Sequence, residues 1–388
     1  MKKILFLLGL LLLTATPTFS EELQGENTMR FVYINGSNNN TPAMEKWFYD
    51  GIDRLHPQMR YQFMNSPFTK EHLLENGKIS INEKPSTFFW GDKTLSDLQT
   101  VDEGLVTTSM LSPKLAQMVR SFFAHCMHDA IWVQKPHNMR KIISELHLQL
   151  KEYYDNGEKV VLFGYSAGSF VTYKYLFYKI CGITSDTIAQ RMKLSQEQKD
   201  FVTKNKINPT CIDALLDSKL AVYSITEELI PNPNFSEFKK AYLSLNETTK
   251  CVCAPDKSIA GIVNYASPIV LFYSEIKDPT LEINKYNADL FKDMKNNDVF
   301  WITVNFADDP LGYPLTKNLT PEEIKQLHDV NFDENGRGFF HDKSDTKSPA
   351  TFLGAHTSYW KYAKKFSKAV VKAYEDGYKN FYPEECKN

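Results

Sequence analysis

The residue with the clearest setting for covalent chemistry is a serine framed by two glycines. The segment Gly164–Gly168 reads Gly-Tyr-Ser-Ala-Gly, which matches the G-x-S-x-G pattern with Ser166 at its centre. The apolar run 159–163 before it is typical of a buried parallel strand, and the residues from Ala167 onward are typical of a helix. A sharp strand-to-helix turn raises the serine hydroxyl into a cleft, so we predict that Ser166 is a nucleophile.

Two further features of this turn follow from its geometry. A side chain at Gly164 or Gly168 would collide with neighbouring backbone, so glycine solves a steric problem at both positions. The amide of Ala167 lies at the positive end of the helix, where it can donate to an oxyanion. The alternative is a glycine-rich turn that only packs a helix tightly against a strand.

A serine nucleophile needs a base within hydrogen-bond reach, and in sites of this kind the histidine comes last along the chain. Three histidines follow Ser166, namely His328, His341 and His356. His356 lies in a short loop just before the last expected helix, among small residues that leave its ring free to move. His341 lies in a polar segment typical of a solvated loop, and His328 lies on an expected surface helix. We predict His356 as the base, with His341 as the alternative.

The base needs an acidic partner that orients its ring, and two adjacent aspartates follow a late strand. The expected strand 299–305 leads into Phe-Ala-Asp-Asp-Pro, which contains Asp308 and Asp309. Successive side chains point apart, so only one of the two can face the imidazole. We favour Asp309, because Pro310 fixes the turn behind it, and Asp308 is the alternative. An ordinary turn would also explain the pair.

A second oxyanion donor is expected from the loop after the first strand. Asn35-Gly36-Ser37 follows the apolar run 31–34, and its glycine allows the backbone to approach a ligand closely. Either the amide of Ser37 or the side chain of Asn35 could donate there. The competing interpretation is a plain Asn-Gly turn.

The elements that would position these residues alternate between strands and helices. This alternation predicts an α/β fold in which a mostly parallel sheet is covered by helices on both faces. The carboxyl ends of the strands then form the edge where ligands bind. We expect strands at 31–34, 61–64, 87–90, 159–163, 262–272 and 299–305, and helices at 42–56, from 112, at 139–153, from 167 and at 359–377.

The chain begins with a segment that resembles a secretory signal peptide. Two lysines precede an apolar run, and small and polar residues follow it within residues 1–20. We therefore expect a protein exported to the periplasm or secreted, with residues 21–388 as the mature domain and no stable membrane anchor. An uncleaved N-terminal anchor is the alternative. The formal net charge of −2 gives no reason to expect nucleic acid as a partner.

The cysteines and the remaining histidines allow other roles. Six cysteines in an exported chain permit disulfides, although the sequence leaves their pairing open, and some of them could equally be buried thiols. His125 and His128, with Asp129, have the spacing of one helix face, but no third ligand with metal-site spacing accompanies them. We expect no metal and no cofactor.

Together these residues resemble the α/β-hydrolase lipases and esterases, and most of all the fungal-type, class 3 lipases. The serine turn Gly164–Gly168 carries the likeness, as do Asp309-Pro310-Leu311 with Pro314, and Tyr359-Trp360 three residues after the expected base His356. The resemblance implies an α/β-hydrolase fold and a serine hydrolase that cleaves carboxylic esters, with an ester or lipid as substrate. A non-catalytic binding protein with this fold, or a peptidase or thioesterase with the same triad, is the alternative.

A long insertion separates the nucleophile helix from the next strand. Residues 182–258 are mostly helical in pattern and leave the core beside the expected mouth of the site, so we expect them to form a cap or lid. An apolar stripe within them either lines an acyl pocket or packs onto the core, and it consists of Phe235, Phe238, Tyr242 and Leu245.

Overall fold

The computed structural model describes most of the expected α/β domain. It covers residues 27–37, 42–94, 128–129, 131–180, 195–207, 236, 239–240, 243, 253–270, 290–315, 336–348, 350 and 353–386. The expected signal peptide, the expected helix from residue 112 and the apolar stripe of the insertion lie outside these residues.

The described residues are built around one seven-stranded sheet in which every pairing is parallel. The strand order is β2-β1-β4-β5-β6-β7, and β3 also pairs with β1. The strands are β1 (Thr28–Ile34), β2 (Ser80–Ile81), β3 (Ser86–Phe88), β4 (Lys159–Tyr165), β5 (Ile259–Tyr265), β6 (Phe300–Phe306) and β7 (Phe339–Thr346).

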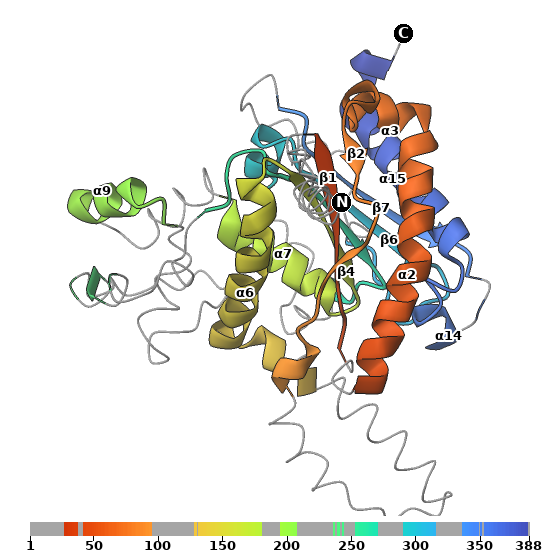
Figure 1. Cartoon of the computed structure of the whole chain (residues 1–388), viewed down its shortest axis with the longest axis horizontal. Helices are drawn as coiled ribbons and strands as arrows, with labels where there is room; N and C mark the ends of the chain where they lie inside the picture. The colour runs from red at the N-terminus through yellow and green to blue at the C-terminus, as the bar shows by residue number, and fades with distance from the viewer. Residues whose placement is uncertain are drawn as a thin grey trace, which may run out of the picture.

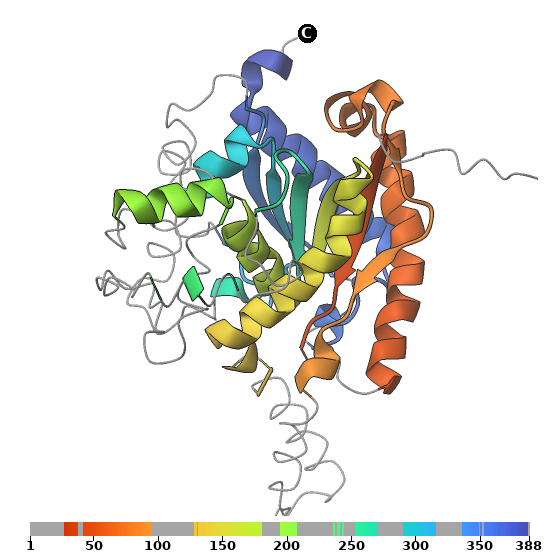
Figure 2. The same cartoon turned by 60° about the vertical axis from the view of Figure 1, so that its left-hand side comes forward.

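Helices cover both faces of this sheet (Figures 1 and 2). On one face lie α6 (Pro136–Asp155) and α7 (Gly168–Lys179), and on the other lie α2 (Pro42–Asn65) and α15 (Ala363–Phe381). The shorter helices are α3 (Pro67–His72), α9 (Gln196–Lys204), α14 (Leu353–His356) and the 3₁₀ turns η1 (Glu75–Gly77), η2 (Gly91–Thr94) and η5 (Pro383–Cys386). The three-layer α/β class expected from the sequence is therefore confirmed.

The central strands are buried on both faces, which explains their continuous apolar sequences. Side chains of β1 alternate between the two helical layers: Val32 and Ile34 pack with α6 and α7, whereas Phe31 and Tyr33 pack with α2 and α15. The ring of Tyr33 stacks on Phe163 of the neighbouring β4, with centroids 4.7 Å apart. These contacts fix the register of β1 against β4. They therefore also fix the relative positions of the loops that follow the two strands.

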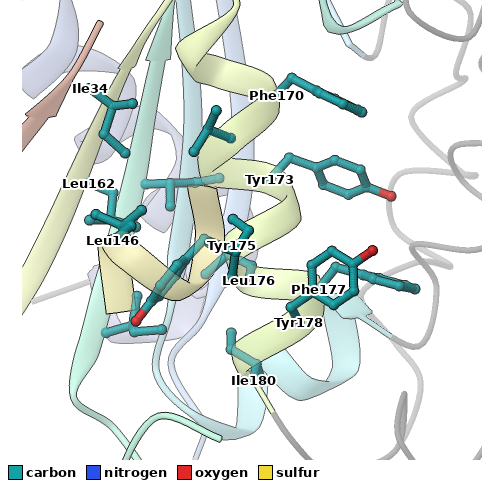
Figure 3. Packing of buried hydrophobic residues seen from close by; sticks show 14 of the residues in the cluster. Ile34, Leu146, Leu162, Phe170, Tyr173, Tyr175, Leu176, Phe177, Tyr178 and Ile180 are labelled. Atoms are coloured by element: carbon teal, nitrogen blue, oxygen red, sulfur yellow. The ribbon is translucent and has the colours of Figure 1, made fainter. Parts of the chain in front are cut away.

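The helix that follows the serine turn is buried almost all round. Every residue of α7 except Lys174 is buried. Figure 3 shows Leu176 and Tyr175 turned toward Leu146 and the sheet, while Phe170 and Tyr173 extend from the opposite side of α7. Apolar side chains on all sides are typical of a helix inside a protein, and burial on this scale holds the N-terminus of α7 in place.

One expected strand is wrong. Residues 61–64 belong to α2, which runs on through Pro57 instead of ending near His56. Proline removes one backbone hydrogen bond from a helix, but Met59 and Phe63 beyond it are fully buried against the sheet. Burial of these side chains outweighs the local cost of the proline, which the residue pattern alone does not reveal.

Two further elements near the carboxyl end of the chain differ from the sequence prediction. The segment around His341, expected as a solvated loop, forms the edge strand β7. The last helix begins at Ala363, four residues later than expected, because Tyr359 and Trp360 are buried in turns ahead of it. Within the described ranges, no helix is long and apolar enough to cross a membrane.

The α2 assignment makes a prediction that two neighbouring aromatic residues can test. In a helix, Phe63 and Tyr61 point to different sides, and they are 0% and 59% exposed. We expect Phe63→Ala to lower the free energy of unfolding by about 3–5 kcal/mol, and Tyr61→Ala to change it by less than about 0.5 kcal/mol. Urea unfolding of both variants would measure this. Equal losses would contradict the helix, because a strand places both side chains on one face.

Candidate active site

The turn between β4 and α7 holds Ser166 in a strained conformation. Its backbone φ is +50°, which is costly for a residue other than glycine. A Cβ at Gly164 would lie 2.7 Å from the backbone oxygen of Gly168, and a Cβ at Gly168 would lie 2.6 Å from the backbone oxygen of Asn35. The steric need for both glycines, expected from the sequence, is therefore confirmed.

Hydrogen bonds hold this strained turn from both sides. The amide of Ser166 donates to the carbonyl oxygen of Tyr265 on β5 at 3.0 Å. The carbonyl oxygen of Ser166 accepts from the amide of Ser169 at 2.9 Å and from its hydroxyl at 2.6 Å. The hydroxyl of Ser169 in turn accepts from Ser267 after β5, at 2.9 Å. Because hydrogen bonds from neighbouring elements hold the turn in place, Ser166 can retain a backbone angle that an isolated peptide would avoid.

Three side chains from distant parts of the chain meet at the carboxyl edge of the sheet. The hydroxyl oxygen of Ser166 lies 3.1 Å from Nε2 of His356, and Nδ1 of His356 lies 3.0 Å and 3.1 Å from the two carboxylate oxygens of Asp309. All three residues are buried. The carboxylate accepts from Nδ1–H, which leaves Nε2 as the acceptor for the serine proton.

The carboxylate of Asp309 is itself fixed by two donors. Its Oδ1 accepts from the amide of Leu311 at 2.9 Å, and its Oδ2 accepts from the hydroxyl of Tyr359 at 2.8 Å. That hydroxyl accepts from the amide of Phe306, at the end of β6, at 2.9 Å. Burial and the nearby carboxylate raise the pKa of Tyr359 well above its usual value, which keeps the hydroxyl protonated as a donor.

The alternatives that the sequence left open lie elsewhere. The exposed side chain of Asp308 accepts from the amide of Ser348 at 3.1 Å, so Asp309 is the aspartate that faces the histidine. His341 is on β7, where its Cβ packs against Gly377 of α15, and burial lowers its pKa. His328 lies outside the described residues.

A fourth residue in contact with His356 was not identified from the sequence. The hydroxyl of Tyr165 donates to the carbonyl oxygen of His356 at 3.1 Å, and the two rings lie 5.4 Å apart. Trp360 packs edge-on against the same Tyr165 ring, with the centroids 4.7 Å apart. Tyr165 therefore fixes both the backbone and the ring plane of His356. The position before the serine marks this residue in the sequence, but only the fold shows what its side chain touches.

The loop after β1 passes directly beside Ser166. A Cβ at Gly36 would lie 2.7 Å from the Cβ of Ser166, so only glycine allows this approach. Ser37 follows it, and among the described residues the amides of Ala167 and Ser37 have no hydrogen-bond acceptor. Both remain candidates for binding an oxyanion.

The side chain of Asn35, the alternative second donor, has a different role. Its amide nitrogen donates to the carbonyl oxygen of Gly36 at 2.9 Å, and its Oδ1 accepts from the amide of Trp90 at 2.8 Å. The indole of Trp90 also donates to the backbone oxygen of Asn35 at 2.7 Å. These bonds hold the Gly36 loop against the segment after β3. Both polar groups of the Asn35 side chain therefore already have hydrogen-bond partners.

Few of the cysteines, and only part of the His125, His128 and Asp129 group, fall within the described ranges. His128 lies 3.5 Å from Asp129, and His125 lies outside the described residues. Among the described residues, no group of three or more potential ligands could hold a metal. Cys253 is disulfide-bonded, and Cys386 is a free thiol.

Comparisons with known proteins add no relative: no protein-family model, no curated protein and no solved structure matches this chain. The geometry must therefore carry the functional argument. A hydroxyl bonded to an imidazole, with a buried carboxylate behind the ring, can transfer the serine proton to the base. Unused amides beside the serine can stabilise negative charge.

The Tyr359 hydroxyl gives a prediction about the support of Asp309. Tyr359→Phe leaves the buried amide of Phe306 without its acceptor and removes one donor from the carboxylate. We expect the free energy of unfolding to fall by about 1–3 kcal/mol. Tyr313→Phe is the control, because Tyr313 is 39% exposed. Denaturant unfolding of both variants measures the difference, and equal stability of the two would argue against the observed bonding.

A second prediction concerns the approach of the β1 loop to the serine. Gly36→Ala places a methyl group against Ser166 and Tyr165, and we expect it to cost about 1–3 kcal/mol of stability. Gly354→Ala on α14 is the matched control, because its nearest neighbour would lie at an ordinary 3.6 Å. We expect that change to be neutral or stabilising by up to about 1 kcal/mol. Thermal unfolding would show the contrast, and a Gly36→Ala variant as stable as the control would rule out the close approach.

Proposed function

We propose that this protein is a serine hydrolase that cleaves carboxylic esters, of the lipase or esterase type. The observation that carries the proposal is the continuous hydrogen-bonded series from Ser166 through His356 to Asp309. The order serine, acid, histidine along the chain and the strand-turn-helix setting of the serine are those of α/β-hydrolases. Ser166 would be the nucleophile, His356 the general base and Asp309 the group that orients the base.

The reaction would proceed in two acyl transfers. His356 takes the proton of Ser166 as its oxygen attacks the ester carbonyl, and the amides of Ala167 and Ser37 bind the resulting oxyanion. His356 then donates that proton to the departing alcohol oxygen, which leaves an acyl-enzyme. Water attacks the acyl carbonyl with His356 again as base, and the carboxylic acid leaves as Ser166 regains its proton.

The architecture supports an α/β-hydrolase fold for the whole domain. The nucleophile follows β4 near the middle of a parallel sheet, the acid follows β6 and the base follows the edge strand β7. Residues 182–258 leave this core between α7 and β5, and we propose that they form the cap over the site. Export through an N-terminal signal peptide, to the periplasm or the medium, is part of the same proposal.

Covalent labelling tests whether Ser166 is activated. We expect a fluorophosphonate probe to label the native protein and to fail on Ser166→Ala, because only a serine with a positioned base reacts rapidly. Ser258→Ala is the control, since Ser258 directly precedes β5 and so lies at the opposite edge of the sheet from Ser166. If the native protein stays unlabelled, the hydrolase proposal fails and a binding role of the fold is favoured.

The two adjacent aspartates offer a matched pair for kinetics. Asp309→Asn should lower kcat by about 10⁴-fold, because an amide no longer holds the required imidazole tautomer. Asp308→Asn should leave kcat within about twofold, because it changes only an exposed bond to Ser348. Rates on short and long acyl esters, amides and thioesters measure both effects. Faster turnover of amides or thioesters would contradict the ester assignment.

A further inference from the structure

A groove on the outside of the α2 and α15 layer carries a concentration of positive charge. It has a volume of about 650 Å³ and is lined by Arg54 of α2, by Trp360 and by four lysines in and just before the first turns of α15. The lysines are Lys361, Lys364, Lys365 and Lys368. Neither Ser166 nor Asp309 lines this groove, so it is separate from the candidate active site.

The four lysines form one stripe, and all four are exposed. Lys364, Lys365 and Lys368 have the spacing of one face of α15, and Lys361 extends the stripe from the turn just before the helix. The buried face of the same helix includes Phe366 and Val370, which pack into the core. The rigid core side of α15 therefore fixes where the stripe lies relative to Arg54.

These cations have no acidic partners among the described residues. The later lysines of the same helix differ, because Lys372 pairs with Asp376 at 2.8 Å and Lys379 pairs with Glu375. On α2, the carboxylate of Asp50 already forms an ion pair with Lys46, with Nζ and Oδ2 2.6 Å apart. In the described part of the chain, Arg54 donates only through its Nε, to the backbone oxygen of Asp50 at 2.9 Å, and its two terminal nitrogens have no acceptor there.

This placement of charge works against the stability of the folded chain. Like charges three and four residues apart on a helix repel each other. Positive charge in the first turns also opposes the positive end of the helix dipole, and the first turn of α15 has no acidic residue to offset it. A local arrangement that costs stability without a compensating contact is typical of a functional surface.

The backbone adds donors to the same place. No side chain caps the start of α15, and among the described residues the amides of Ala363, Lys364 and Lys365 have no acceptor. Ammonium groups, a guanidinium with free terminal nitrogens and these amides are the donors that bind phosphate oxygens in proteins. A multiply charged anion would also relieve the repulsion among the lysines.

We propose that this groove binds a phosphate group, either of a small phosphorylated molecule or of a lipid headgroup. The volume is in the range of sites for small organic ligands. Trp360, which lines the groove, packs edge-on against Tyr165, whose ring lies 5.4 Å from His356, so two aromatic rings would separate the bound group from His356. The proposal does not depend on the hydrolase function, because phosphate binding is measured directly.

The test compares two variants of the full chain that remove the same charge from the same helix. Lys364→Gln/Lys365→Gln removes two groove lysines, and Lys372→Gln/Lys379→Gln removes two paired lysines outside it. Inorganic pyrophosphate, followed by titration calorimetry, probes a free phosphate ligand. Cosedimentation with phosphatidylglycerol vesicles, against phosphatidylcholine vesicles, probes a lipid headgroup.

We expect native protein to bind one of these two probes, more weakly at higher salt. The groove variant should bind it about tenfold more weakly or worse, with the control variant unchanged. Binding of pyrophosphate identifies a soluble phosphate ligand, and binding of phosphatidylglycerol vesicles alone identifies a lipid headgroup. Absence of binding to both probes, or equal loss in both variants, overturns the proposal.

Melting temperature gives an independent check that both variants fold. Removal of Lys364 and Lys365 should leave it unchanged or raise it, because repulsion is relieved. Loss of the paired lysines of the control should leave it unchanged or lower it slightly. A clear drop in the groove variant would show that these lysines stabilise the fold, and would contradict the proposal.

Discussion

The parallel direction of the strands is the constraint on which the site depends. Because β1, β4, β5 and β6 all run the same way, the loops that follow them leave from one edge of the sheet. Gly36, Ser166, Ser267 and Asp309 each lie in one of those loops. If one of these strands were antiparallel, its loop would emerge at the opposite edge and the hydrogen-bonded series could not form.

The strained backbone of Ser166 persists because the surrounding hydrogen bonds and packing hold the turn in this one conformation. The bonds to Tyr265 and Ser169 fix its backbone, while the Gly36 loop and α7 close around it. The same principle applies at Asp309, which the Leu311 amide and the Tyr359 hydroxyl hold in one orientation. Rigid support of this kind positions reacting groups before a substrate arrives, which lowers the reorganisation required during reaction.

The distribution of charge illustrates why a net value says little about a surface. The chain has a formal net charge of only −2, yet one groove is lined by five cations that have no acidic partner within the described ranges. Lysines further along the same helix are neutralised by neighbours three or four residues away. Such pairing is a property of helical spacing and packing, so it depends on where α15 begins and on which side is buried.

The sequence by itself determined the α/β class, the serine turn with its two required glycines, the histidine that contacts the serine, and a pair of adjacent aspartates from which the partner of that histidine comes. The strand and the serine turn have local signatures, which are an apolar run and a turn that only glycine permits. The histidine and the aspartate pair follow from the chain order serine, acid, histidine. It did not determine the continuation of α2 past Pro57, the edge strand at His341, or the choice between Asp308 and Asp309.

Only the tertiary structure decided these points, because each depends on contacts between residues far apart in the chain. Burial of Phe63 against the sheet overrides the proline, and pairing with β6 makes a strand of a polar segment. The contacts of Tyr359 and Tyr165 with the site likewise exist only once β4, β6 and α14 are brought to one edge. Local patterns specify elements, whereas packing specifies which side chains touch.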